Sequence, residues 1–351
     1  MKKLLVCLCA VALFGCKEDP KPEPVKDYVT FAGKIENPNS DSLFVYLGRD
    51  WSKTIKVAPD GTFKDTFKIA EPNMYRFYDG SEQGALFLKN GYDLNLTLDT
   101  KEFDETIKFA GNGEVSNNFL AEKARIEEKV FDVDALSELD SISFISKMTT
   151  IKSNLSEFYN SNKEVDSIVI AKSNESLEPM TASFGNYVQS KIALKKALPK
   201  GSKSPEFKNF ENFAGGNKSL NDLKGKYVYI DLWATWCGPC KAEIPSLKEL
   251  DQTYKDKNLQ IVSISVDNGR GYQGNSMELA KEGWKKMIKE ENLGGLQLIS
   301  PNGWENQFIK DYQVFGIPRF ILLDPEGNIV SADAPRPSDP KLKELFTSLN
   351  I

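Results

Sequence analysis

The sequence predicts three structural parts: an α/β domain at the C-terminus, preceded by a small antiparallel β-sandwich and a helical connector. Segments typical of strands and helices alternate after residue 199, whereas residues 28–112 contain short strands separated by turn signals. Residues 113–198 have helical periodicity and contain no proline between Val115 and Glu178. The length of 351 residues agrees with two to three domains of about 150 residues each.

The composition is that of a globular protein and excludes several function classes. Lysine and arginine number 45 against 50 acidic residues, giving a formal charge of -5, so there is no cationic excess for binding nucleic acid. The chain has no histidine, which excludes Ser-His-Asp hydrolysis, Cys-His proteolysis, His-ligated zinc and haem ligation by histidine.

Residues 1–15 are predicted to be a secretory signal. Lys2 and Lys3 precede an apolar run that is too short to span a bilayer. The residues Leu13-Phe14-Gly15-Cys16 resemble the lipobox of bacterial lipoproteins, which implies cleavage before Cys16 and a lipid anchor on its thiol, followed by a tether over 16–27. An uncleaved anchor and a plain secretory signal are the alternatives. We expect the protein to be located in the cell envelope, and we favour the periplasmic face over the cell surface.

The β-sandwich is predicted from alternating segments such as Leu94–Leu98 and from turn signals such as Pro59-Asp60-Gly61 and Asn90-Gly91. Its aromatic residues are interpreted as core. The connector that follows is expected to hold three to five helices, which either space the domains or dock a partner.

The C-terminal domain, 199–351, opens with a linker and then has a βαβ layout. We expect a buried strand over 227–232, a helix over 237–254, a strand over 260–266, a helix over 277–291, a strand over 320–323 and a closing helix from 341. Between the first strand and its helix lies Trp236-Cys237-Gly238-Pro239-Cys240. Because Cys7 and Cys9 lie in the signal, only Cys237 and Cys240 remain as free thiols if Cys16 is acylated.

The spacing of these two cysteines suits thiol-disulfide exchange. At a helix start, unpaired N–H groups and the helix dipole stabilise the Cys237 thiolate. Gly238 and Pro239 place Cys240 about one turn on, where it can attack a mixed disulfide on Cys237. A structural disulfide would close a loop too short to stabilise the fold much, and half of a zinc site would need two further ligands.

The motif WCGPC after an apolar strand resembles the active site of the thioredoxin superfamily, and the whole chain resembles TlpA/ResA-like thiol-disulfide oxidoreductase lipoproteins with an N-terminal β-domain. The resemblance implies a thioredoxin fold, Trp236 covering Cys237, and Pro245 kinking the helix. It implies a cis-proline loop at Ile317-Pro318 for substrate binding. It also implies that Asp231 is the buried base for the second cysteine; a capping aspartate and a trans-proline turn are the competing interpretations.

Three positions depart from the thioredoxin pattern or extend it. Ser263 stands where thioredoxins carry a lysine near the buried aspartate. Arg319 replaces the threonine that commonly follows the cis-proline, and it either favours acidic clients or pairs with a surface carboxylate. Glu243 matches a glutamate of the TlpA/ResA branch, which places a second acid near the cysteines; a helix-surface salt bridge with Lys248 or a neighbour is the alternative.

The Gly-Pro dipeptide resembles that of reducing thioredoxins, so we expect reduction of disulfides in envelope proteins, with cytochrome c maturation among the compatible roles. No nicotinamide or flavin fingerprint is present, so no cofactor and no metal are expected, and electrons would come from a membrane donor of the DsbD or CcdA type. An alternative interpretation as a thiol peroxidase needs a threonine three positions before the reactive cysteine. That position is Ala234, which weakens this interpretation. A surface binding lipoprotein with a vestigial redox domain is the alternative from another class.

Overall fold

The computed structural model describes residues 26–351; the signal, Cys16 and most of the tether lie outside the described residues. The chain divides into two compact units. One contains the residues up to Val133 together with Ile145–Phe184, and the other contains Asp134–Phe144 and Gly185–Ile351. The predicted helical connector is therefore shared between the two units.

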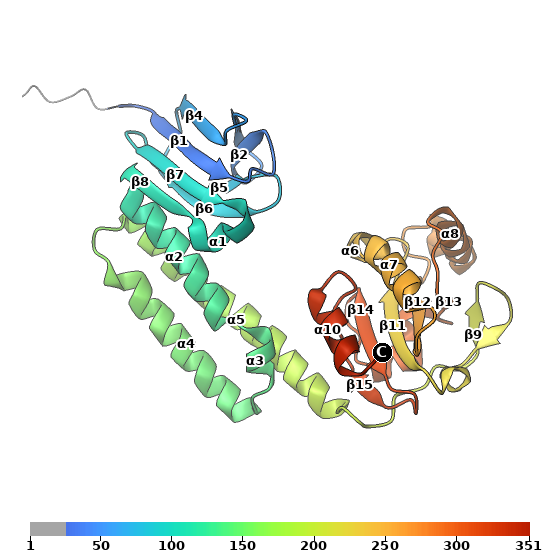
Figure 1. Cartoon of the computed structure of the whole chain (residues 1–351). Coiled ribbons are helices and arrows are strands. Elements are labelled where there is room, and N and C mark those ends of the chain that lie inside the picture. The colour runs from blue at the N-terminus through green and yellow to red at the C-terminus, as the bar shows by residue number, and fades with distance from the viewer. Residues whose placement is uncertain (1–25) are drawn as a thin grey trace, which may run out of the picture. The chain divides into compact units, whose positions relative to one another are not determined.

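The first unit contains two four-stranded sheets (Figure 1). Their strand orders are β4-β1-β7-β8 and β3-β2-β5-β6. The strands are β1 (Val29–Glu36), β2 (Ser42–Leu47), β3 (Trp51–Lys56), β4 (Thr62–Phe67), β5 (Asn73–Tyr78), β6 (Gln83–Leu88), β7 (Asp93–Asp99) and β8 (Lys108–Asn112). Side chains alternate in β7, where Leu94, Leu96 and Leu98 are buried and the residues between them are not.

One strand pair departs from the expected antiparallel arrangement. β1 pairs in parallel with β7, from Thr30 opposite Asp93 to Glu36 opposite Asp99, whereas the other pairs in both sheets are antiparallel. A parallel pair needs a long crossover connection, and the chain between β1 and β7 supplies it by adding β4 to this sheet and forming the other sheet from β2, β3, β5 and β6.

Helices follow, as the periodicity predicts. They are α1 (Phe103–Thr106), α2 (Glu114–Val130), α3 (Val133–Ser137), α4 (Ser141–Ser161) and α5 (Ser167–Ala197). Phe119 of α2 stacks on Phe158 of α4 with ring centroids 5.1 Å apart. Across residues 26–351, no helix has both the length and the apolar character needed to cross a bilayer.

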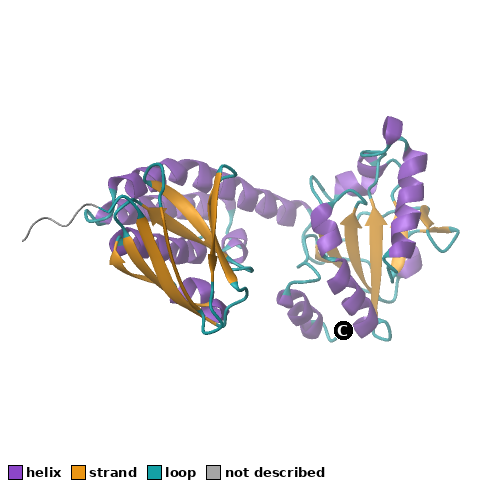
Figure 2. Cartoon of the chain, turned by 90° about the horizontal axis from the view of Figure 1, so that it is seen from above, coloured by secondary structure: helices purple, strands orange, loops and turns teal. Residues whose placement is uncertain are grey.

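The second unit is built on a seven-stranded sheet with helices on both faces (Figure 2). Its order is β10-β9-β13-β12-β11-β14-β15, and its strands are β9 (Phe210–Asn212), β10 (Asn217–Lys218), β11 (Tyr227–Trp233), β12 (Leu259–Ser265), β13 (Leu296–Ile299), β14 (Arg319–Leu323) and β15 (Ile329–Ser331). β11, β12 and β13 are parallel, and β14 is antiparallel to β11. The helices are α6 (Gly238–Ala242), α7 (Ile244–Tyr254), α8 (Met277–Glu290), α9 (Gln307–Asp311) and α10 (Pro340–Ser348). The predicted thioredoxin-like α/β domain, preceded by sheets and helices, is confirmed.

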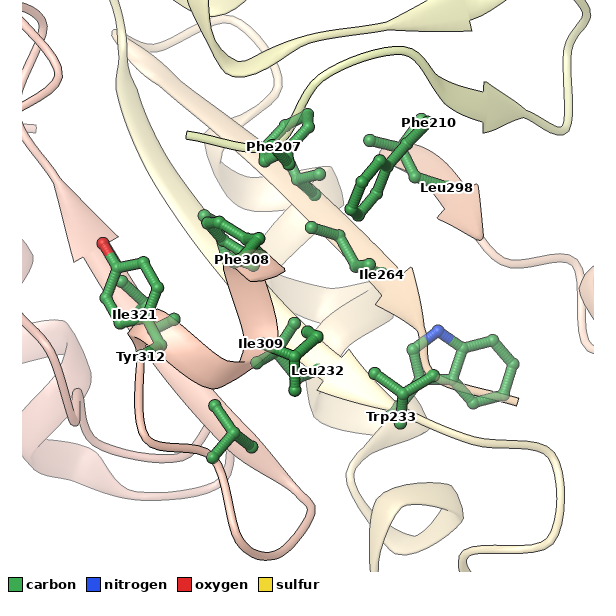
Figure 3. Close-up of a cluster of buried hydrophobic side chains, with 14 of the residues drawn as sticks. Phe207, Phe210, Leu232, Trp233, Ile264, Leu298, Phe308, Ile309, Tyr312 and Ile321 are labelled. Atoms are coloured by element: carbon green, nitrogen blue, oxygen red, sulfur yellow. The ribbon is translucent and has the colours of Figure 1, made fainter. Parts of the chain in front are cut away.

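Apolar cores on the two faces fix β11 at the centre of this sheet. One core combines Leu232 and Trp233 of β11 with Phe207, Phe210 and Phe308, as Figure 3 shows. The other contains Tyr229, which stacks on Phe320 with centroids 5.6 Å apart. Because β11 is covered on both faces, its C-terminal end is a rigid base for the residues that follow.

Candidate active site

The two cysteines of the motif form a disulfide where β11 leads into α6. The Cys237–Cys240 bond joins residues whose Cα atoms are 5.3 Å apart. Both residues are nearly buried, whereas Gly238 and Pro239 between them are exposed. The reactive pair therefore lies behind a small surface formed by its own intervening dipeptide.

The prediction of one helix over 237–254 is wrong in two details. It begins at Gly238, with Cys237 as the N-cap, and it is broken at Glu243, after which α7 starts with Pro245 in its first turn. The Cys237 Sγ accepts the backbone N–H of Cys240 at 3.2 Å. The Cys237 sulfur thus occupies the N-cap position, where an acceptor satisfies an unpaired donor of the first turn. The stabilisation of a Cys237 thiolate stays a prediction.

A second loop approaches the same sulfur. The Ile317–Pro318 peptide bond is cis, and the Ile317 carbonyl oxygen lies 3.9 Å from the Cys237 Sγ. A Cβ atom added to Gly238 or to Gly316 would meet no neighbouring atom within 4 Å. Gly238 and Gly316 thus border open space, and the Cys237 sulfur lies just beneath them.

Asp231 lies behind the cysteines, in the middle of the sheet. Only 4% of its surface is exposed, and it is paired in register with Ser263 of β12. Burial raises the pKa of Asp231 to about 7; a hydrogen bond from Ser263 opposes this rise, and the negative charge of Glu243 adds to it. Its carboxyl group therefore exchanges protons near neutral pH.

A small cavity connects this carboxyl group with the second cysteine. Its volume is about 20 Å³, and Asp231, Cys240 and Ser263 are among its lining residues. A cavity of this size has room for one water molecule. The geometry allows a proton to pass between the Asp231 carboxyl group and the Cys240 sulfur through such a water.

Glu243 lies at the break between α6 and α7 and is 5% exposed. Its carboxylate accepts hydrogen bonds from the backbone N–H and the hydroxyl group of Ser338, each at 3.0 Å, and Arg336 approaches to 3.8 Å. The alternative interpretation was a surface salt bridge with Lys248 or a neighbour. Lys248 pairs instead with Glu291 at 4.0 Å, and the cation that pairs with Glu243 is Arg336. Glu243 is a buried acid whose charge acts on Asp231.

Arg319 follows the cis-proline, and its side chain pairs with groups of the segment that follows β15. Its Nε donates to the Ala332 carbonyl at 3.0 Å and lies 3.3 Å from the Asp333 carboxylate, which Lys191 of α5 also contacts. Its side chain is 17% exposed. The structure favours the pairing interpretation over the recognition of acidic clients.

Sequence reasoning missed a buried aspartate that holds the turn before the motif. Asp267 is fully buried and accepts hydrogen bonds from the Thr235 hydroxyl at 2.8 Å, the Thr235 N–H at 3.1 Å and the Ser265 hydroxyl at 2.7 Å. The Tyr272 hydroxyl lies 3.1 Å from the Thr235 hydroxyl. The only local signal was a carboxylate directly after a buried strand.

The tryptophans take different positions. Trp236 is half-buried, and the guanidinium group of Arg270 lies 5.0 Å from its ring centroid. Trp284 is fully buried and Trp304 packs against the same core, so both are packing residues. Within the described part of the chain, no cluster of three or more acidic or cysteine side chains could hold a metal ion.

Comparisons with known proteins point to the same chemistry. A family model described as Redoxin matches residues 199–349. The thiol-disulfide oxidoreductase ResA of one Bacillus cereus strain is 30% identical over 139 residues, which cover 40% of this chain and 72% of that protein. ResA of Bacillus thuringiensis subsp. konkukian (strain 97-27) is 28% identical over 149 residues, covering 42% and 78%.

A solved structure is also similar. The thioredoxin domain of a thiol-disulfide oxidoreductase from Bacteroides vulgatus is 32% identical, with a TM-score of 0.37, and the match covers 43% of this chain and 98% of that one.

Proposed function

This chain belongs to the TlpA/ResA-like branch of the thioredoxin superfamily and is a thiol-disulfide oxidoreductase; from that membership we propose that it reduces protein disulfides in the cell envelope through Cys237 and Cys240. The observation that carries the proposal is the disulfide at the start of α6, beside the Ile317 carbonyl and beneath the exposed Gly238-Pro239 dipeptide.

In the first step, the Cys237 thiolate of the reduced protein attacks one sulfur of a client disulfide. A bond forms between the Cys237 Sγ and that sulfur, the client disulfide breaks, and the other client sulfur leaves as a thiolate. The N–H of Cys240, which points at the Cys237 Sγ, stabilises the attacking anion.

In the second step, Cys240 resolves the mixed disulfide. Asp231 accepts the Cys240 proton, by way of a water in the adjoining cavity, and the new thiolate attacks the Cys237 Sγ. The Cys237–Cys240 disulfide forms and the second client sulfur leaves. The client gains two electrons and two protons, and the protein is oxidised by the same amount. A pKa of about 7 suits Asp231 to this exchange at neutral pH.

The cis-proline loop is proposed to hold the client during both steps. Among the residues that the structure describes, none accepts a hydrogen bond from the backbone N–H groups of 315–317. An extended client segment can pair with this backbone by strand addition, which aligns its disulfide with the Cys237 Sγ. Gly238 and Pro239 border the same space.

The cellular setting of the proposal rests on the sequence. The apolar run and Leu13-Phe14-Gly15-Cys16 support a lipid anchor at Cys16 in the cell envelope, with the reductase domain on the periplasmic side. Electrons would then come from a membrane donor of the DsbD or CcdA type, and clients would be disulfide-bearing envelope proteins, apocytochrome c being one compatible class.

The test is to trap the mixed disulfide. With Cys240→Ala, the client stays bound to Cys237, and non-reducing gels followed by mass spectrometry identify the captured proteins. The matched control, Cys237→Ser with Cys240→Ala, must capture none. If the single variant also captures none, and Cys237→Ser alone leaves the cellular phenotype unchanged, the redox domain is vestigial and the binding-lipoprotein alternative holds.

A further inference from the structure

An exposed aromatic side chain lies on the loop that borders the reactive sulfur. Phe315 is 92% exposed, the highest value among the large apolar residues that the structure describes, whereas its neighbour Val314 is buried. A single exposed apolar residue is ordinary on a protein surface. The position of Phe315 is what makes it informative, because it lies two residues before Ile317.

The distances place this ring within reach of a bound client. The Ile317 carbonyl oxygen is 3.9 Å from the Cys237 Sγ. Two residues of chain span at most about 7 Å, so the Phe315 Cα lies within about 7 Å of the Ile317 Cα. Gly316 between them leaves open space. A client segment that is joined to Cys237 and paired with Ile317 would therefore have the exposed Phe315 as a near neighbour.

Arg319, the charged candidate on this loop, is already engaged. It donates to the Ala332 carbonyl and pairs with Asp333, as described above. The loop therefore offers a client an aromatic ring in place of a free guanidinium group. Aromatic rings gain free energy when another apolar side chain removes them from water.

We propose that Phe315 is the specificity-determining residue of this oxidoreductase, and that it selects clients with a large apolar side chain two or three residues from the reacting cysteine. The inference rests on the proposed reductase function. It names the substrate class as extended segments that expose apolar residues next to a disulfide, as unfolded and misassembled chains do. A native disulfide surrounded by polar residues reacts without this contact.

The experiment compares two peptides. In each, the single cysteine is joined through a disulfide bond to the same small fluorescent thiol, which is released on reduction. They differ only in having leucine or serine at the positions two and three residues from the cysteine. The reduced full-length protein is expected to reduce the leucine peptide about tenfold faster, equivalent to about 1.4 kcal/mol. Phe315→Ser is expected to lower the rate for the leucine peptide to that for the serine peptide, so that the preference is lost. Phe315→Leu is expected to retain most of it.

The matched control is Ile142→Ser, which removes another exposed apolar side chain, 82% exposed, from α4. It is expected to preserve the tenfold preference. A preference that survives in Phe315→Ser, or equal rates for both peptides with the unmodified protein, overturns this inference alone. If the unmodified protein reduces neither the peptides nor the small disulfide, the proposed function fails with it.

Discussion

Replacing Asp231 with asparagine is expected to stabilise the protein while slowing its reaction. The folded-state pKa of about 7 exceeds the ordinary value of 3.8. At about 1.36 kcal/mol per pH unit, this difference corresponds to about 4 kcal/mol. The burial that raises the pKa of the proposed base therefore destabilises the fold once the group is ionised.

The sign of the effect follows from where the proton resides. Below about pH 4 the carboxyl group is protonated in both the folded and the unfolded chain. Between about pH 4 and pH 7 the unfolded chain ionises while the folded chain keeps its proton, so the free energy of unfolding falls as pH rises. Above pH 7 both states are ionised and the full loss is present. Asp231→Asn has no ionisable group at this position, so its free energy of unfolding does not fall in this way.

Urea denaturation of the oxidised protein at pH 4, 6 and 8 measures this difference. Asp231→Asn is expected to match the unmodified protein at pH 4 and to exceed its free energy of unfolding by about 4 kcal/mol at pH 8. Asp256→Asn, a change to an exposed carboxylate, is the control and is expected to show no such divergence. A stability gap that does not change with pH would contradict the assignment of the raised pKa to Asp231.

The same variant is expected to slow resolution of the mixed disulfide. General bases commonly contribute a hundredfold or more, but bulk water can take the proton when Asp231 is absent, so we expect a decrease of about tenfold at pH 7. Stopped-flow measurement after rapid formation of the mixed disulfide isolates this step. An unchanged rate at pH 7 would mean that Asp231 has only a structural role.

Two further changes test the groups around the site. Glu243→Gln keeps hydrogen-bonding groups for Ser338 but removes a charge that raises the pKa of Asp231, so the pH midpoint of the resolution rate is expected to move downward; an unmoved midpoint argues against electrostatic coupling. Asp267→Asn replaces an acceptor of the Thr235 and Ser265 hydrogen bonds with a donor, which is expected to cost about 3 kcal/mol in urea denaturation and to slow reduction of small disulfides. A loss below about 0.5 kcal/mol would show that the turn before the motif does not depend on Asp267.

The features that the sequence predicted well are those encoded in neighbouring residues. An apolar run from Tyr227 to Leu232 followed by the cysteine motif predicts a buried strand leading into a helix, and β11 and α6 have that arrangement. Helical periodicity across 113–198 predicts helices for the same reason, because each face of a helix is set by residues three and four apart.

The features that it could not predict depend on residues far apart in the chain. Alternating apolar residues identify β1 and β7 as strands, but alternation carries no information about which strand pairs with which, so their parallel pairing was missed. Glu243 is buried because Ser338, 95 residues later, provides two hydrogen bonds. The Arg319 side chain is mostly buried, and its Nε pairs with the Asp333 carboxylate. Nothing near Arg319 in the sequence indicates this contact.

The environments of the two sulfurs explain why one motif can carry out two different steps. The Cys237 Sγ accepts the N–H of Cys240 and lies beside the cis-proline loop, where the proposed function places the client. Cys240 adjoins the cavity that Asp231 also lines, so its proton has a local acceptor. If the acid were beside Cys237, its negative charge would oppose the attacking thiolate. In the proposed mechanism, the N–H of Cys240 therefore stabilises the attacking anion on Cys237, and the base acts on the resolving cysteine.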